Sequence, residues 1–70
     1  MVIGSAAGTA DNSYRYCIEC MITGNEIPLR TVRETFSALG SSLVVGGSHR
    51  KVRVHLHGND PERVFETAAG

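Results

Sequence analysis

A β-strand that runs directly into the start of a helix constrains the fold of this chain more than any other stretch. Apolar and polar residues alternate along residues 51–57, and successive side chains of a strand point to opposite faces of its sheet. One face carries Val52, Val54 and Leu56, and the other carries Arg53, His55 and His57. Because a sheet buries its apolar face, we expect the two histidines to lie together on the face that no helix covers.

A helix is expected directly after this strand. Asp60 is of the residue type that caps a helix by accepting a hydrogen bond from a free backbone N–H, and Pro61 suits the first helical position. The apolar residues Val64, Phe65 and Ala68 then provide a side of the helix that can be buried.

A strand, a helix and a further strand are expected before this region. Residues 14–22 alternate and predict the first strand. Its faces carry Tyr16, Ile18, Cys20 and Ile22 on one side and Arg15, Cys17, Glu19 and Met21 on the other. A helix is expected from Pro28 until just before Gly40. Its apolar stripe consists of Leu29, Val32, Phe36 and Leu39. Residues 42–45 form a short second strand, and residues 46–49 turn the chain back.

The order βαββα predicts an α+β fold, a two-layer sandwich similar to a ferredoxin-like half-wrap. We expect a three-stranded sheet with both helices on one face, and the third strand in the centre, beside the first and parallel to it. The first strand is then an exposed edge that can pair with a second copy, which predicts a homodimer. Residues 1–13 show no periodicity and are expected to be a flexible lead or linker, which leaves residues 14–70 as a single small domain.

Size and charge exclude several classes of function. With 70 residues the chain has a thin core, because so short a chain buries only about 60% of its unfolded surface. Such a domain usually needs a metal, a partner subunit or neighbouring domains. Seven basic and seven acidic residues balance to a net charge of zero, which argues against nucleic acid or an anionic membrane as a partner. We find no run near the roughly 20 apolar residues of a membrane span and no signal peptide, so we expect a cytoplasmic location.

Cys17 and the two histidines form a candidate metal site. Neighbouring strands lie about 4.8 Å apart, so Cys17 on the open face of the first strand is within reach of His55 or His57 on the third. One thiolate and two imidazoles suit zinc or a similar divalent metal. The fourth position is open to Glu19, to water or to a group from elsewhere. Cys17 and Cys20 are three residues apart and face opposite sides of a strand, which does not favour a shared Cys-x-x-Cys site.

Three other interpretations remain open. A His-x-His pair is also typical of ordinary polar residues on the solvent side of a sheet. Alternatively, the chain is a small catalytic module in which Cys17 is a nucleophile activated by His55 or His57, with Glu19 as the orienting group. It can also be a plain interaction domain whose open sheet face binds another part of a longer protein. Cysteine is usually buried, so its presence on the polar face favours the metal interpretation.

Three segments, at residues 16–19, 39–45 and 52–61, resemble the middle domain of the bacterial fatty acid kinase family. Residues 39–45, followed by residues 52–61 with the motif His-Leu-His-Gly-Asn-Asp-Pro, carry the most specific part of the likeness. The segment Tyr16-Cys17-Ile18-Glu19 is similar to the family's Tyr-Cys-Thr-Glu strand, with Ile18 departing at the third position. In the proteins of this family a dihydroxyacetone-kinase-like nucleotide domain precedes the middle domain, and a DegV-like lipid-associated domain follows it.

The resemblance implies a non-catalytic middle domain of a fatty acid kinase-like or DegV-type protein. It implies that Cys17, His55 and His57 occupy the family's metal-associated positions, and that the domain helps to dimerise the parent enzyme and to couple its end domains. The turn at residues 47–50 departs from the acidic turn common in the family, which leaves the metal positions intact. Since these residues resemble neither end domain, we expect the fragment itself to bind no nucleotide and to phosphorylate nothing.

Overall fold

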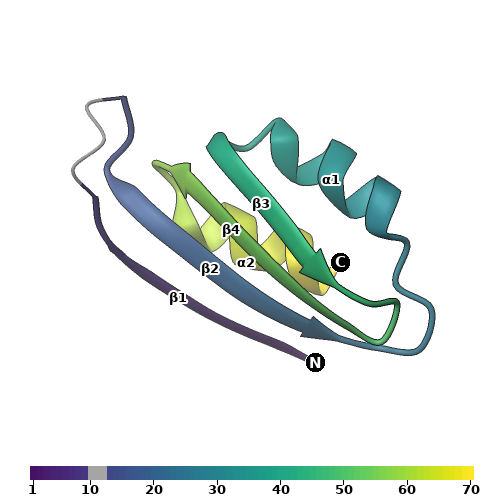
Figure 1. Ribbon diagram of the computed structural model, residues 1–70. Coiled ribbons are helices and arrows are strands. Elements are labelled where there is room, and N and C mark those ends of the chain that lie inside the picture. The colour runs from purple at the N-terminus through teal and green to yellow at the C-terminus, as the bar shows by residue number, and fades with distance from the viewer. Residues whose placement is uncertain (10–12) are drawn as a thin grey trace.

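Four antiparallel strands form a sheet, and two helices cover one of its faces (Figure 1). The computed structural model describes residues 1–9 and 13–70. The elements are β1 (Val2–Gly8), β2 (Tyr16–Thr23), α1 (Leu29–Ser37), β3 (Ser41–Gly47), β4 (Lys51–Gly58) and α2 (Pro61–Ala69). The order of strands in the sheet is β1-β2-β4-β3. The predicted α+β class, with its sheet layer and helix layer, is therefore confirmed.

Strand β4 forms the centre of the hydrophobic core. Its side chains of Val52, Val54 and Leu56 are fully buried, and so is Ile18 on the neighbouring strand β2. Full burial of a side chain of this size stabilises the fold by about 1.5–3 kcal/mol. The alternation read from the sequence of these two strands thus matches their burial.

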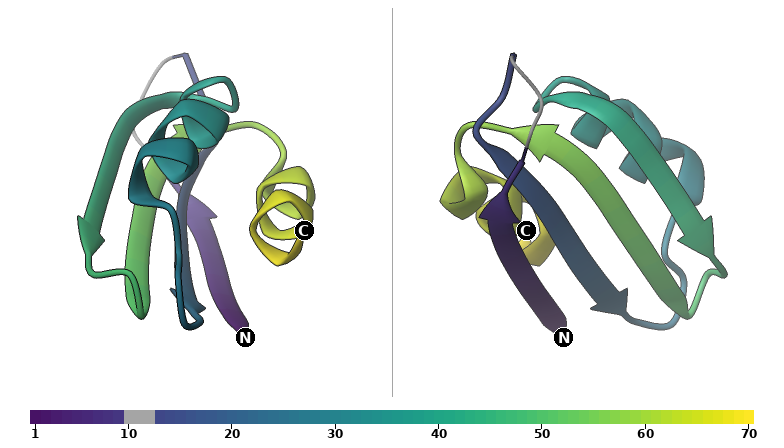
Figure 2. Two further views of the ribbon diagram at one scale, coloured as in Figure 1. Left: turned by 90° about the vertical axis from the view of Figure 1, so that its right-hand side faces the viewer. Right: turned by 60° about the vertical axis from the view of Figure 1, so that its left-hand side comes forward.

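Both helices pack on the same face of the sheet and close the core. Helix α1 lies over β3 and buries Val32 and Phe36, while α2 lies over β1 and β2 and buries Val64 (Figure 2). The predicted cap of α2 is present, because the Asp60 carboxylate accepts a 3.2 Å hydrogen bond from the backbone N–H of Arg63. Neither of these helices is long and apolar enough to cross a membrane. The opposite face of the sheet is left open.

The sheet has four strands, and the prediction of three was wrong. Residues 2–8, expected to be part of a flexible lead, form β1 and pair antiparallel with β2 along their whole length. After Val2, the positions of β1 on the helix side are Gly4, Ala6 and Gly8. These residues carry too little apolar surface to produce an alternating pattern, so the strand left no periodic signal in the sequence.

Strand β1 also changes which edges of the sheet are open. The edge of β2 that was expected to be exposed is covered by β1, so β1 and β3 are the outer strands of the sheet. Residues 10–12 of the expected lead lie outside the described part of the chain. The domain boundary at residue 14 stays a prediction.

Strand β4 runs antiparallel to β2, and the prediction of a parallel pair was wrong. Strands β3 and β4 form a hairpin and therefore run in opposite directions. The crossover through α1 returns the chain so that β3 runs in the same direction as β2. Because β2 and β3 run in the same direction and β4 is antiparallel to β3, β4 must also be antiparallel to β2. The predicted position of β4, in the centre and beside β2, was correct.

Gly4 allows α2 to pack closely on β1. A Cβ atom at this position would lie 2.4 Å from Cε1 of Phe65, well inside van der Waals contact. A Cβ atom at Gly8 in the same strand would meet no atom within 4 Å. Strand β1 therefore needs a residue without a side chain at position 4 in order to pack against α2.

We predict that Gly4→Ala lowers the free energy of unfolding by about 1–3 kcal/mol, because the ring of Phe65 and helix α2 must move outward. Gly8→Ala is the matched control in the same strand. It should leave the free energy of unfolding unchanged or raise it by up to about 1 kcal/mol, because alanine restricts the unfolded chain. Urea denaturation followed by circular dichroism measures both variants. Equal effects would show that β1 does not pack against α2 in solution.

Candidate metal centre

Cys17, His55 and His57 lie together on the open face of the sheet. Cys17 belongs to β2 and both histidines belong to β4, and the register places Cys17 opposite His57 and Glu19 opposite His55. The alternation that buries the apolar side chains of β4 directs its histidines to the other face. The predicted proximity is therefore present, although the two strands run in opposite directions.

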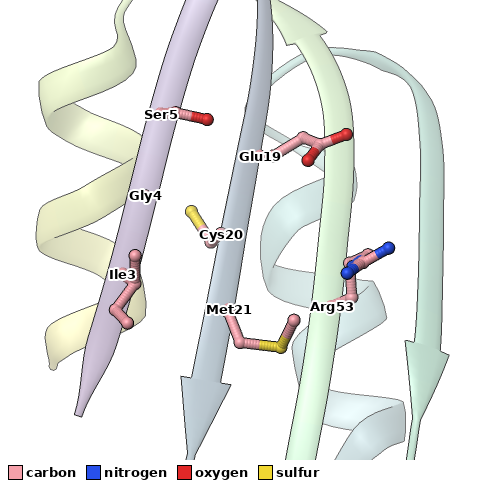
Figure 3. Close-up of a pocket in the computed structure, with 7 residues that line it drawn as sticks. All are labelled: Ile3, Gly4, Ser5, Glu19, Cys20, Met21 and Arg53. Carbon is pink, nitrogen blue, oxygen red and sulfur yellow. The ribbon is translucent and has the colours of Figure 1, made fainter.

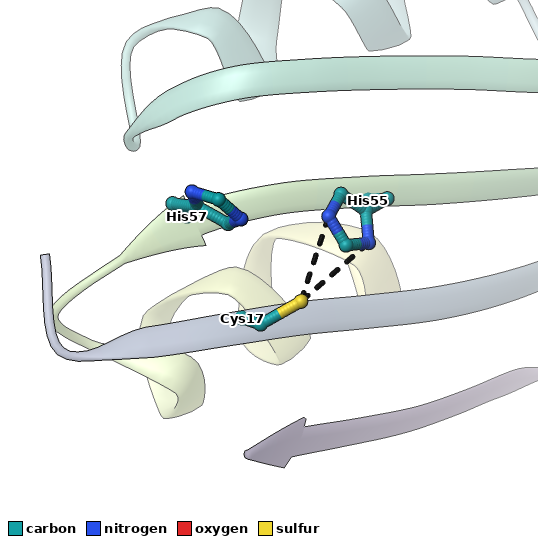
Figure 4. A group of neighbouring side chains, drawn as sticks. All are labelled: Cys17, His55 and His57. Atoms are coloured by element: carbon teal, nitrogen blue, oxygen red, sulfur yellow. Dashed lines mark hydrogen bonds between the residues drawn. The ribbon is translucent and has the colours of Figure 1, made fainter. Parts of the chain in front are cut away.

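The three side chains could hold one metal ion. One ligand atom from each lies within 4.8 Å of the others, and all three residues are half-buried. Figure 4 shows the sulfur of Cys17 facing the ring of His55, with His57 further along the same strand. The distance from Cys17 Sγ to His55 Nε2 is 3.5 Å. In a tetrahedral zinc site the bond lengths place sulfur and nitrogen about 3.5 Å apart, so this pair already has the required spacing.

The two imidazole rings approach each other edge to face. Their centroids are 5.5 Å apart and their planes meet at 65°. The residues are two apart on one strand face, so their backbone positions are separated by roughly 6.5 Å and the rings have converged. This arrangement is compatible with both rings turning a nitrogen toward the same ion.

Glu19 contacts the cluster through the ring of His55. Its Oε1 lies 3.3 Å from His55 Nδ1, and the side chains of His55 and Glu19 are 30% and 54% exposed. Pairs as exposed as this contribute little to folding, typically less than about 1 kcal/mol. The contact therefore bears on the chemistry of the imidazole more than on the stability of the fold.

A β-bulge in β3 lies beside the cluster and was not predicted. Ser41 pairs with His57 and Val44 pairs with His55, so β3 has one more residue than β4 between these positions. Ser42 has a φ of 55° within this stretch. Bulges change the direction of nearby side chains and are frequent next to functional sites. The glycine and two serines at 40–42 are the weak sequence signal for this irregularity.

Cys20 lies on the opposite face of β2 and takes no part in the cluster. Its side chain is only 2% exposed, and burial raises the pKa of its thiol above the ordinary value of 9.0. Both cysteines are free thiols. As the strand geometry predicted, the Cys-x-x-Cys spacing forms no shared site.

A shallow hollow of about 140 Å³ is lined by residues of β1, β2 and β4, among them Glu19 (Figure 3). Its lining consists of Ile3, Gly4, Ser5, Glu19, Cys20, Met21 and Arg53. Glu19 borders both the hollow and the cluster, whereas the three candidate ligands do not line the hollow. Pockets for small molecules usually measure about 300–1,000 Å³, so this space is too small for a typical cofactor.

A comparison with models of protein families tests the resemblance seen in the sequence. The family model of the FakA-like middle domain, named for a subunit of fatty acid kinase, matches residues 13–70. The chain belongs to this family. The predicted family is thereby confirmed, and a middle domain implies a longer, multidomain parent chain. No curated protein and no solved structure matched the chain.

We predict that a thiol reagent labels Cys17 in the folded middle domain and leaves Cys20 unmodified. Cys17 is half-buried on the open face, whereas Cys20 is enclosed in the core and its raised pKa keeps it in the unreactive thiol form. Mass spectrometry after brief exposure to iodoacetamide at mildly alkaline pH measures each site. Both cysteines should react in denaturant, and Cys17→Ser should abolish the fast labelling. Comparable labelling of Cys20 in the native protein would contradict its burial.

Proposed function

We propose that the chain is the non-catalytic middle domain of a fatty acid kinase-like or DegV-type protein and holds a zinc-type ion on its open sheet face. The observation that carries this proposal is the convergence of one thiol and two imidazoles from neighbouring strands. Membership of the middle-domain family supports the linking role. The resemblance of the motifs supports the three metal positions.

The donor set fits zinc better than the hard divalent cations. Thiolate sulfur and imidazole nitrogen suit zinc, whereas magnesium and calcium prefer oxygen ligands. An ion held by Cys17, His55 and His57 would tie β2 to β4 on the face that the core does not reach. Metal binding of this kind contributes directly to folding, which matters in a domain with a small core.

The parent protein in this proposal is a cytoplasmic fatty acid or dihydroxyacetone-type kinase, or a lipid-binding relative. Its nucleotide and lipid chemistry belongs to neighbouring domains, and the middle domain connects them. The family match supports this arrangement, because a middle domain implies further domains in the same chain.

Homodimer formation through β1 or the open face is a further part of the proposal. Among the described residues, the large hydrophobic side chains that are exposed are Met1 (77%), Ile3 (61%) and Val44 (62%). Ile3 pairs with Met21 and Val44 pairs with His55, so both lie on the same face as the cluster. Strand β1 also carries no charged residue and presents a free edge, which favours pairing with another strand.

A catalytic module with Cys17 as nucleophile is the second candidate. The observation in its favour is the chain of contacts from Cys17 Sγ to His55 at 3.5 Å and from His55 to Glu19 at 3.3 Å, similar to a nucleophile, a base and an orienting group. A relay of this kind does not need His57, whereas a metal site can use it as a third ligand, which favours the metal. Slower labelling of Cys17 in a metal-free His55→Ala variant would favour the nucleophile instead.

We predict about one zinc ion per chain in protein purified without a histidine tag. Cys17→Ser and His57→Ala should each lose most of the ion, because two remaining ligands hold zinc poorly. Elemental analysis by mass spectrometry measures the content. The content should also fall as the pH is lowered, since protons compete with the ion for the thiolate and the imidazoles.

The matched control for the metal measurement is His49→Ala. His49 lies in the exposed turn between β3 and β4, away from the cluster, so this variant should keep its zinc. Wild-type protein that bound no divalent metal at neutral pH would leave a plain interaction domain as the better account.

We predict a dimer at micromolar concentration in sedimentation velocity. Ile3→Lys should shift the protein toward monomer, because it places a charge on the exposed apolar side of β1. Ser37→Lys adds the same charge at an exposed position of α1 and is the matched control. A monomeric wild type would refute the dimer, and an unchanged dimer in Ile3→Lys would exclude this part of the sheet as the interface.

A further inference from the structure

The two nitrogens of His55 have different neighbours. Nδ1 lies 3.3 Å from Oε1 of Glu19. Nε2 is the ring nitrogen nearer to the sulfur of Cys17, at 3.5 Å against 3.7 Å for Nδ1. The carboxylate thus approaches Nδ1, and Nε2 is the ring nitrogen closer to the sulfur. The backbone register produces this arrangement, because Glu19 is the direct cross-strand partner of His55.

A neutral imidazole carries a proton on one nitrogen and a lone pair on the other. A carboxylate accepts hydrogen bonds and donates none, so a contact with Nδ1 favours the form that has its proton on Nδ1. The lone pair then lies on Nε2, which is the form required of a histidine that binds metal through this nitrogen. Carboxylates in this position are common behind metal-binding histidines, where they orient the ring and raise its basicity.

Glu19 itself is poorly placed to bind the same ion. The ligand atoms that lie within 4.8 Å of one another come from Cys17, His55 and His57, and within the described chain this group does not include Glu19. Its Oε1 instead lies 3.3 Å from His55 Nδ1, whereas Nε2 is the nitrogen of that ring nearer to Cys17 Sγ. Its carboxylate therefore contacts the His55 ring at Nδ1.

We propose that Glu19 is a positioning residue, which holds His55 in the Nδ1–H form so that Nε2 is presented to the ion, and that Glu19 is not the fourth ligand. This inference rests on the proposed metal function. It decides between the two roles that the sequence left open for this carboxylate. It also leaves the fourth coordination position to water or to a group from outside the cluster.

The first experiment is done on the metal-free protein. Long-range ¹H–¹⁵N NMR spectra report which nitrogen of each neutral histidine carries the proton. We expect the Nδ1–H form of His55 in the wild type and its loss in Glu19→Ala. Glu19→Gln keeps a side-chain oxygen that can accept the hydrogen bond, and should retain the Nδ1–H form in part. Glu34→Ala removes a carboxylate from the exposed side of α1 and should change nothing.

The second experiment measures zinc affinity by competition with a chromophoric chelator. Glu19→Ala should bind zinc at the wild-type stoichiometry but about 10–100-fold more weakly, as is typical when a carboxylate behind a metal-binding histidine is removed. In the cobalt-substituted protein, Glu19→Gln should leave the positions of the visible absorption bands unchanged, because the ligands remain the same. A shift of these bands would identify Glu19 as a ligand and overturn the proposal.

The two experiments separate this proposal from the metal function. In one outcome the protein binds zinc, while neither the protonated nitrogen of His55 nor the zinc affinity depends on Glu19. That result would overturn the positioning role alone. Alternatively, Glu19 can determine which nitrogen of His55 carries the proton in a protein that binds no zinc. That result would overturn the metal function, and with it the role of Glu19 toward an ion. Glu19 is more than half exposed, so its variants should fold, and their remaining NMR signals check this directly.

Discussion

The antiparallel pairing of β2 with β4 is the interaction on which the rest of the structure depends. Its register sets Cys17 opposite His57 on the open face and Ile18 opposite Leu56 in the core. A slip of one residue would exchange the faces of a strand, so that β4 would bury its histidines and expose its apolar side chains. The core and the candidate metal centre therefore rely on the same backbone hydrogen bonds. A change that loosens this pair of strands should weaken both.

The two faces of the sheet are completed in different ways. On one face the helices close a core around β4 (Figure 2). On the other face the described chain supplies no covering element, and the cluster and the exposed side chains of Ile3 and Val44 lie there together. An ion that joined β2 and β4 on this face would reinforce the same strand pair that the core holds from the other side. For a chain of 70 residues such reinforcement is a substantial addition to a small core.

The features that escaped sequence reasoning share a physical cause. Periodic patterns are recognised from large apolar side chains. The unpredicted strand β1 is rich in small residues, and the bulge in β3 follows Gly40 and Ser41. In β1 the helix side carries Gly4, Ala6 and Gly8, and Gly4 is required because Phe65 takes the space of a side chain. In β3 the bulge is formed around Ser42. The antiparallel direction of β4 relative to β2 was not predicted for another reason. It depends on the path of the connecting segments, and the sequence pattern of a strand is the same for either direction.

The sequence by itself determined which residues share a face of each strand, the cap of α2, the family, and that Cys17 comes near a pair of histidines. These follow from local periodicity, cap chemistry and motifs, which need no knowledge of distant contacts. Only the tertiary structure decided which histidine lies opposite Cys17 and which lies opposite Glu19. Backbone hydrogen bonds are chemically alike in every register, so this choice is made when the whole core packs. It is the choice that directs Glu19 to Nδ1 of His55.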